Sequence, residues 1–305
     1  MILDGSIFYI IIKQLMGKQF KRIYLEITNL CNLNCSFCPI DQRSAKEMSY
    51  DNFVKTIDQA RPMADQICLH LMGEPLAHPN IDQILNYCSE VESKIQLTTN
   101  GLLLDKFKES IVKNNCVAQV NISLQSYMDN FPKANLKKYL DKVFSFIEFA
   151  HEKRSDLYIN LRLWNLDDSD ENESNNLVFD YLDDKLNIEI NRRVDVGGIK
   201  SKKIKDHLYL HFDSRFEWPR MDLPYQGEQG RCRALIDHIA IHADGTVVPC
   251  CLDDQKIINL GNCFESNLES IINSNRASEM KQGFLNGVLK EELCKRCSYI
   301  NRFKK

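Results

Sequence analysis

The strongest constraint on the fold is a regular alternation of short apolar runs with longer amphipathic stretches between residues 22 and 193. The short runs alternate apolar and polar residues or are apolar throughout, which is typical of β-strands. The predicted strands are residues 22–28, 67–72, 94–101, 117–126, 158–164 and 187–193, and the predicted helices are residues 50–61, 80–91, 103–114, 134–153 and 174–185. Strands that alternate with helices form parallel sheets. We therefore expect an α/β partial barrel of six units, with its site at the carboxyl ends of the strands.

Composition narrows the class of protein. The chain has 305 residues, a net charge of −3 and 12 cysteines. The mild acidity argues against a protein that holds duplex nucleic acid mainly by neutralising phosphates, and the 44% hydrophobic content excludes a polytopic membrane protein. An apolar run at residues 6–16 is interrupted by Lys13, and no signal-cleavage site follows it. We expect a short helix there that packs on the body of a cytoplasmic protein, whose cysteines are reduced.

In a reducing compartment, clustered cysteines favour metal ligation. Cys31, Cys35 and Cys38 follow the first predicted strand. A four-iron cluster that is held by three cysteines keeps one iron open to an exchangeable ligand. A closed zinc site needs a fourth ligand, and none of the flanking residues is a histidine.

This cysteine spacing, with Phe37 before the third cysteine, resembles the signature of the radical S-adenosylmethionine (radical SAM) family. The resemblance implies a 4Fe–4S cluster on Cys31, Cys35 and Cys38, which would be the catalytic centre. In that family the open iron chelates S-adenosylmethionine, and one electron cleaves it to methionine and a 5′-deoxyadenosyl radical. The radical then takes a hydrogen atom from the substrate.

A second resemblance follows the second predicted strand. Residues 71–75 resemble the Gly-Gly-Glu-Pro element of the family, with Met72 in place of the first glycine. Gly73 and Glu74 would then hold the amino group of S-adenosylmethionine, since a carboxylate and exposed carbonyls suit an ammonium group.

Three later strands end in further polar residues. Ser123 and Gln125 resemble the ribose-binding element of the family, with Gln125 where an acid is common, and the alternative is a capped strand end. Asn100 either faces the cofactor site or makes a turn. Arg162 would reach the carboxylate of S-adenosylmethionine or an acidic substrate, or would make an ordinary ion pair.

Four cysteines of the tail form a second set. The Asp-Gly pair at 244–245 predicts a hairpin turn that would bring Cys232 and Cys250 together from opposite strands. Cys294 and Cys297 form a Cys-x-x-Cys pair. Four thiolates suit zinc or a fully ligated iron–sulfur cluster, and the residues alone leave both open.

The spacing resembles the auxiliary-cluster domain called SPASM, in its short twitch form. It implies one auxiliary 4Fe–4S cluster on these four cysteines, with Cys263 or Cys251 as the substitute for a wrong member. The implied architecture is an N-terminal helical extension at 1–20, a partial (β/α)6 TIM-like barrel at 21–215, and a cluster domain of β-hairpin and helix at 216–305.

The resemblance implies an oxidative radical SAM enzyme that abstracts hydrogen from a C–H bond and passes an electron to the auxiliary cluster. Aminocyclitol or sugar dehydrogenation and peptide maturation are the favoured reactions. The expected partner is a low-potential electron donor such as flavodoxin or ferredoxin, with no membrane. His70 and Glu26 are weak predictions for a catalytic base.

Two alternatives remain from the sequence. One is a radical SAM enzyme that modifies RNA or tRNA, because basic and aromatic side chains could bind unpaired bases. Those side chains are Lys200, Lys202, Lys203, Lys205, Phe212, Phe216 and Trp218. The other alternative is a non-catalytic iron–sulfur or zinc module that binds a partner.

Overall fold

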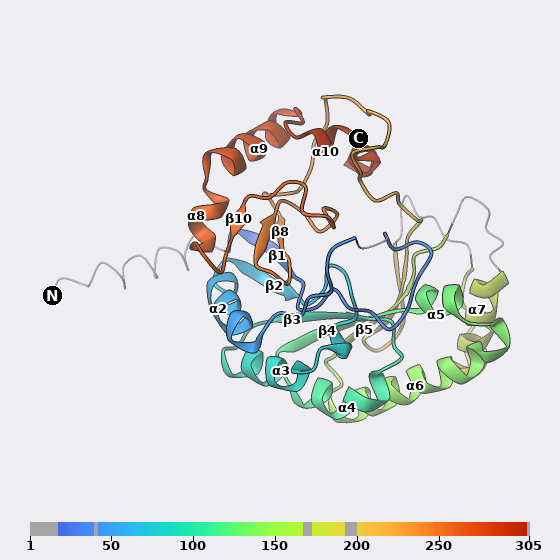
Figure 1. The fold of residues 1–305 in the computed structure, drawn as a ribbon. Coiled ribbons are helices and arrows are strands. Elements are labelled where there is room, and N and C mark those ends of the chain that lie inside the picture. The colour runs from blue at the N-terminus through green and yellow to red at the C-terminus, as the bar shows by residue number, and fades with distance from the viewer. Residues whose placement is uncertain (1–17, 40–41, 167–172, 193–199, 304–305) are drawn as a thin grey trace.

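The computed structural model describes residues 18–39, 42–166, 173–192 and 200–303, and its strands form one ten-stranded sheet (Figure 1). In spatial order the strands are β10 (Gly261–Asn262), β9 (Thr246–Val248), β8 (His238–Ile241), β1 (Phe20–Leu25), β2 (Ala64–Cys68), β3 (Ile95–Thr99), β4 (Val117–Ser123), β5 (Tyr158–Leu163), β7 (Leu208–Phe212) and β6 (Ser201–Lys205). Strands β1 to β5 and β7 run parallel. The predicted α/β partial barrel is therefore confirmed.

Helices connect the parallel strands and cover the outer face of the sheet (Figure 1). They are α2 (Tyr50–Ala60), α3 (Ile81–Glu90), α4 (Leu104–Lys113), α5 (Leu124–Asn130), α6 (Leu136–Lys153) and α7 (Glu173–Leu186). Helix α2 shows why the sequence folds this way. The Ser49 side chain caps it by accepting from the backbone N–H of Asn52. Phe53, Ile57 and Ala60 then share one buried face at helical spacing.

The inner face of the sheet is polar, and it encloses a cavity instead of a packed core. On β1, Ile23 and Leu25 are fully buried in the hydrophobic core, whereas Arg22 and Tyr24 line a cavity of about 830 Å³. Polar side chains of the other parallel strands line the same cavity: Gln96, Gln119, Asn121, Asn160, Arg162 and His211. The sheet thus packs its apolar side chains against the outer helices and turns its polar side chains toward the cavity.

The predicted sixth strand at 187–193 is wrong for the described residues 187–192, which form a loop. The backbone N–H groups of Ile188 and Ile190 donate to the backbone and the side chain of Asp183, so α7 satisfies them instead of a neighbouring strand. The sixth parallel strand is β7, and β6 pairs with it antiparallel at the edge.

The predicted strand at 117–126 is too long. Strand β4 ends at Ser123, and α5 begins at the next residue, so Gln125 lies in the first turn of a helix. Leu124 is fully buried. Its burial continues the apolar pattern of the strand into the helix, which hides the boundary in the sequence.

The C-terminal part continues the sheet of the barrel, because β8 pairs in parallel with β1. Strands β8 and β9 form the predicted hairpin, and Gly245 takes a φ of +86° in its turn. Cys232 and Cys250 lie outside both strands, which corrects the prediction that they sit on them. The helical part of the predicted cluster domain is α8 (Leu268–Ile272), α9 (Asn275–Asn286) and α10 (Glu292–Lys295).

The predicted helix at 6–16, with most of the predicted extension at 1–20, lies outside the described residues. Most of the acidic segment at 167–174 also lies outside them. Within the described ranges, every helix is too short or too polar to cross a membrane.

Candidate functional site

The three cysteines after β1 lie at the carboxyl ends of the parallel strands. Cys31, Cys35 and Cys38 line a cavity of about 190 Å³, together with residues that follow β2, β3 and β4. A hydrogen bond from Cys38 lowers the pKa of the Cys35 thiol to about 7, whereas burial raises the pKa of Cys31. Three thiols of one loop on one cavity wall suit a metal centre that keeps a coordination position open.

Helix α5 braces this cysteine loop through hydrogen bonds from its last two residues. The Asp129 carboxylate accepts from the Ser36 hydroxyl at 2.7 Å and also from the Ser36 backbone N–H. The Asn130 side chain accepts from the Asn34 N–H at 3.0 Å and donates to the Cys35 sulfur at 3.2 Å. Neither brace has a local sequence signal, because both join residues more than 90 positions apart.

The Gly73-Glu74 turn after β2 packs tightly against the start of the cysteine loop. Gly73 has a φ of +75°, and a Cβ atom there would lie 2.3 Å from the carbonyl oxygen of Thr28. The N–H of Glu74 donates to the Leu30 carbonyl oxygen at 2.9 Å. Only glycine fits this approach, so the turn and the loop are placed as one unit.

The Glu74 carboxylate is buried and joins two loops. Its oxygens accept from the backbone N–H groups of Leu76 at 3.0 Å and Asn100 at 2.7 Å. Burial raises the pKa of Glu74 to about 7, although these two hydrogen bonds oppose the rise. Glu74 lines the smaller cavity, as the sequence analysis expects, but much of its hydrogen-bonding capacity holds the β2 and β3 loops together.

The other predicted cofactor residues also line the smaller cavity: Phe37, Asn100, Ser123, Gln125 and Arg162. Asn100 donates to the Asn32 side chain at 2.7 Å, which fixes it against the cysteine loop. Within the described chain, Oε1 of Gln125 and Nε of Arg162 are buried without a hydrogen-bond partner. Unsatisfied polar atoms on a cavity wall fit a polar ligand that would complete them.

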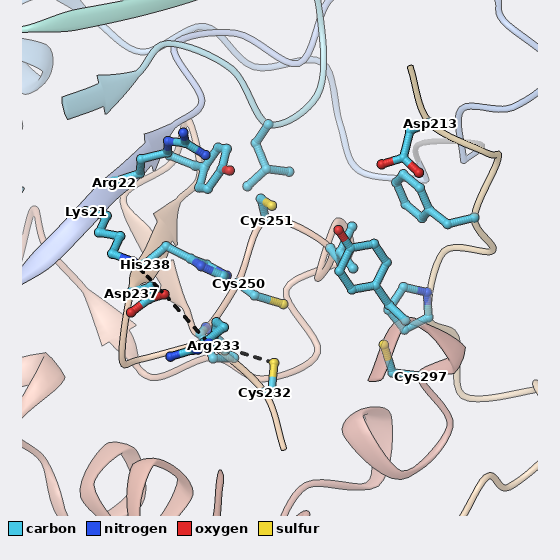
Figure 2. Close-up of a pocket in the computed structure, with 18 of the residues that line it drawn as sticks. Lys21, Arg22, Asp213, Cys232, Arg233, Asp237, His238, Cys250, Cys251 and Cys297 are labelled. Atoms are coloured by element: carbon cyan, nitrogen blue, oxygen red, sulfur yellow. Dashed lines mark hydrogen bonds and ion pairs between the residues drawn. The ribbon is translucent and has the colours of Figure 1, made fainter. Parts of the chain in front are cut away.

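The four tail cysteines lie at the larger cavity (Figure 2). Burial is the main cause that raises the pKa of each of Cys232, Cys250, Cys294 and Cys297. The Cys232 thiol contributes to the rise at the other three, so the four thiols share one site.

These four thiols offer a set of sulfur donors at one cavity. Four thiolates suit either a zinc ion or a fully ligated iron–sulfur cluster, so the donor set leaves both open.

The remaining cysteines divide into two groups. Cys251 lines the larger cavity beside its neighbour Cys250. Cys263 is buried, and its sulfur lies 3.8 Å from the Thr56 hydroxyl of α2. It lines neither cavity. Cys68, Cys88 and Cys116 are also buried.

The two cavities adjoin, because the same side chains line both. These residues are His70, Leu71, Arg162, Trp164, Phe216 and Trp218. Trp218 belongs to the segment after β7, and its indole N–H donates to the Phe37 carbonyl oxygen at 3.1 Å. That segment therefore closes over the cysteine loop and lines both chambers.

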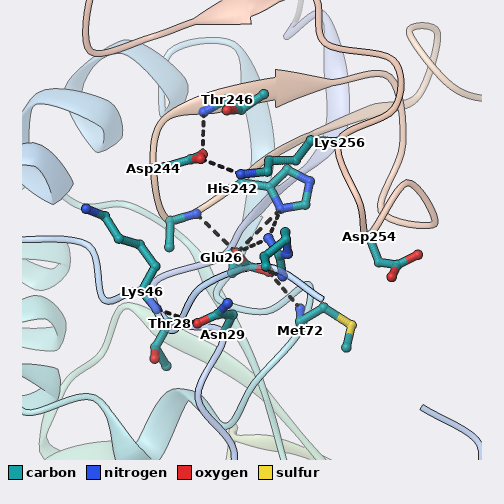
Figure 3. A network of polar contacts seen from close by, with 12 residues as sticks. Glu26, Thr28, Asn29, Lys46, Met72, His242, Asp244, Thr246, Asp254 and Lys256 are labelled. Carbon is teal, nitrogen blue, oxygen red and sulfur yellow. Dashed lines mark hydrogen bonds and ion pairs between the residues drawn. The ribbon is translucent and has the colours of Figure 1, made fainter. Parts of the chain in front are cut away.

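His70 and Glu26, the weakly predicted bases, occupy different environments. His70 lies between the cavities, and burial together with Arg162 and Arg22 lowers its pKa to about 3. Glu26 lies in neither lining and is held in a buried network with Arg43 and His242 (Figure 3). His70 is therefore a neutral imidazole near neutral pH, and Glu26 is a structural carboxylate.

Two family profiles match the chain. The Radical SAM superfamily matches residues 25–171. SPASM, an iron–sulfur cluster-binding domain, matches residues 232–298. The first range contains the three-cysteine loop, and the second contains the four cysteines of the tail.

Similar curated proteins include two cyclases. The probable GTP 3′,8-cyclase of Methanococcus maripaludis is 32% identical over 36% of this chain and 38% of that protein. The GTP 3′,8-cyclase of Clostridium perfringens is 28% identical over 63% of this chain and 61% of that protein. The chain thus spans less than two-thirds of the length of these relatives.

Similar solved structures include three proteins. BtrN in complex with AdoMet and 2-DOIA has a TM-score of 0.58 and 18% identity, over 93% of this chain and 94% of that one. SuiB of Streptococcus suis, bound to precursor peptide SuiA, has a TM-score of 0.61 and 16% identity, over 96% and 75%. Tagged anSMEcpe with bound AdoMet has a TM-score of 0.56 and 15% identity, over 91% and 86%. At these identities the similarity concerns the fold.

Proposed function

Because this chain belongs to the radical SAM superfamily and carries a SPASM iron–sulfur cluster-binding domain, we propose that it is an oxidative radical SAM enzyme. The two domains imply 4Fe–4S clusters and S-adenosylmethionine as cofactors. The observation that carries the proposal is the pair of adjoining cavities. One is lined by three cysteines and the other by five, four of which form the predicted set, and six residues line both.

We assign the catalytic cluster to Cys31, Cys35 and Cys38, which leave a coordination position for a small molecule. The auxiliary cluster is assigned to Cys232, Cys250, Cys294 and Cys297, a set that would ligate it fully. When bound, these clusters and S-adenosylmethionine supply a radical that removes a hydrogen atom from a C–H bond and a site for the remaining electron.

The residues of this chain bind and orient the cofactor and the substrate. The exposed backbone edge of Gly73 and Glu74 would hold the amino group of S-adenosylmethionine. Ser123 and the unsatisfied Gln125 amide would bind its ribose hydroxyls. Asn100, which donates to Asn32, would keep the cysteine loop against that ligand.

The residues that line both cavities would surround the substrate carbon that loses its hydrogen atom. Trp164, Phe216 and Trp218 present apolar surface on both sides of the junction, which excludes water from a reactive radical. His70 is neutral, and its Nδ1 is buried without a partner in the described chain. It would accept a hydrogen bond from a substrate hydroxyl next to the carbon that loses hydrogen, and its lowered pKa makes it an orienting group instead of a proton acceptor.

The larger cavity indicates the size of the substrate. Its volume of about 830 Å³ would be shared between the auxiliary cluster, whose four cysteines line it, and the substrate, so the remaining space suits a small molecule. Its inner wall is rich in amides, which suits a hydroxylated compound such as a sugar or an aminocyclitol. Peptide maturation stays a second possibility within the same chemistry, in which one side chain of a peptide enters the cavity.

The RNA alternative has less support from the side chains on which it depends. Phe212 is fully buried, so it is not available to stack on a base. Lys200 lies 3.1 Å from Asp213 in an ion pair. Phe216 and Trp218 line the cavities instead of forming an open stacking surface.

Anaerobic reconstitution tests the proposal. With dithionite and S-adenosylmethionine, the protein should bind about eight irons and form 5′-deoxyadenosine, measured by mass spectrometry. Cys35→Ala should abolish this product, whereas Cys88→Ala, which changes a cysteine outside both sets, should keep it. A chain that binds about eight irons and never cleaves S-adenosylmethionine would contradict the proposal and support a non-catalytic module.

Three further expectations belong to the same proposal. A low-potential donor such as flavodoxin or ferredoxin would reduce the enzyme in the cell. The chain would work in the cytoplasm, where its thiols stay reduced. Its barrel would occupy residues 21–215 and its cluster domain residues 216–305.

A further inference from the structure

The larger cavity has a wall of hydrogen-bonded amides. Asn160 donates to the Asn121 side-chain oxygen at 2.9 Å, and Gln119 donates to the same oxygen at 2.8 Å. Asn121 in turn donates to the Thr98 hydroxyl at 3.1 Å. These partly satisfied groups retain hydrogen-bonding capacity toward the cavity, so they suit a polar ligand.

The acidic side chains at this cavity are already neutralised. Asp213 lies 2.8 Å from Arg302 and 3.1 Å from Lys200. Asp237 lies 3.5 Å from Lys21 and 3.9 Å from Arg233 (Figure 2). Each carboxylate therefore has two basic partners, and neither is left to balance another cation.

Two arginines of the cavity wall lack such a partner. Arg22 and Arg162 line the cavity from β1 and β5, and within the described chain neither makes an ion pair with a carboxylate. Arg162 stacks on Trp164 with its guanidinium carbon 4.4 Å from the ring centroid, and its Nε is buried without a partner. Arg22 is exposed, so the cost of a buried cation without a counter-ion applies to Arg162, and it favours binding of an anion there.

The two guanidinium groups act on the same region of the cavity. Both lower the pKa of His70 and of His211, after burial as the main cause. The histidines are therefore neutral near neutral pH and add no competing charge. The net charge of this part of the wall comes from Arg22 and Arg162.

We propose that the substrate carries an oxyanion, a phosphate ester or a carboxylate, which Arg22 and Arg162 bind in the larger cavity. This inference rests on the proposed function and narrows its substrate class. Arg162 also lines the smaller cavity, so an anion held there would place the rest of the substrate at the junction near His70. Guanidinium groups bind both oxyanions through paired hydrogen bonds.

Calorimetry on the anaerobically reconstituted protein tests this site, with inorganic phosphate and acetate as probes. The wild type should bind at least one of them, and Arg22→Gln and Arg162→Gln should each weaken binding by about 10- to 100-fold. Lys142→Gln, which changes an exposed lysine of α6, is the matched control and should bind as the wild type does. Tighter phosphate binding assigns a phosphate ester, and tighter acetate binding assigns a carboxylate.

The inference would be overturned if the wild type bound neither probe. It would also be overturned if both arginine variants bound the probes as tightly as the wild type does. Failure of the proposed function looks different, because calorimetry does not depend on cofactor cleavage. A protein that binds phosphate but forms no 5′-deoxyadenosine would contradict the proposed function and leave the anion site standing. A protein that cleaves S-adenosylmethionine but binds neither probe would support the proposed function and overturn the anion site.

Discussion

The carboxylate of Glu26 forms a two-pronged ion pair with the guanidinium of Arg43, at 2.8 Å and 2.9 Å. The same carboxylate accepts from the backbone N–H groups of Met72 at 3.3 Å and Ala243 at 3.2 Å, and it lies 3.4 Å from His242 (Figure 3). One buried side chain thus joins the cysteine loop, the turn before Gly73 and the C-terminal hairpin. The two halves of the candidate site share this anchor.

Glu26→Gln should strongly destabilise the protein. Glu26 is 1% exposed and Arg43 is 10% exposed, so the substitution removes the Glu26 charge from beside a largely buried guanidinium. Loss of one partner of a buried ion pair costs about 3–5 kcal/mol. Urea unfolding should show this loss, and Glu152→Gln, at an exposed pair with Lys153, should change stability by less than about 1 kcal/mol. Equal stability of both variants would contradict the assigned role.

The same carboxylate predicts a loss of stability in acid. Burial raises the pKa of Glu26, but hydrogen bonds from His242 and Arg43 outweigh it and lower the pKa from 4.5 to about 2. Because the folded pKa is the lower one, this contribution is complete above about pH 4.5 and is lost as the pH falls toward 2. The stability difference between wild type and Glu26→Gln, measured by urea unfolding from pH 6 downward, should shrink through this window. A difference that stays constant below about pH 4 would contradict the prediction.

Gly73→Ala should impair binding of S-adenosylmethionine more than it lowers the stability of the folded protein. Gly73 has a φ of +75°, and its new methyl group would lie 2.3 Å from the Thr28 carbonyl oxygen, which must move with the cysteine loop. Gly287→Ala is a matched control, because Gly287 has a φ of +76° with nothing within 4 Å. Both carry the backbone strain of about 1 kcal/mol. Only Gly73→Ala should reduce 5′-deoxyadenosine formation, by about 10-fold or more.

Alternation along the chain predicts the strands well, but it does not reveal what the polar face of a strand contacts. On β1, Ile23 and Leu25 mark the buried side. Arg22 on the other side is exposed, as the pattern indicates, and only closure of the barrel makes it part of a cavity wall. The sequence indicates an acidic ligand for Arg162 but not that Arg22 lines the same cavity, whereas the cysteine motifs are visible in their spacing.

Contacts between distant segments were the other limit. Glu26 and His242 are 216 positions apart, and Asp129 lies 93 positions from Ser36. Neither pair carries a local pattern that would connect its members. The predicted sixth strand failed for a local reason, because Asp183 satisfies the amides of Ile188 and Ile190, which a strand pattern assigns to a neighbouring strand.

Asn130→Asp should weaken the catalytic cluster selectively. The variant keeps an acceptor for the Asn34 N–H, but it replaces the amide that donates to the Cys35 sulfur by a negative charge. A carboxylate next to a thiolate ligand raises the energy of the charged site. Bound iron should fall from about eight toward about four after reconstitution. Asn273→Asp, at an exposed position between α8 and α9, should keep the full iron content.

Cys297→Ala should remove the auxiliary cluster and leave the first cleavage step. The variant lacks one of four ligands at the larger cavity, while the three-cysteine loop and its braces from α5 are unchanged. Bound iron should fall to about four per chain, and 5′-deoxyadenosine should still form. Cys263→Ala is the control and should keep about eight irons, because its sulfur contacts Thr56 instead of the cavity. If Cys297→Ala kept its iron while Cys251→Ala lost about half, the ligand set would instead contain Cys251, which shares the cavity wall with Cys250.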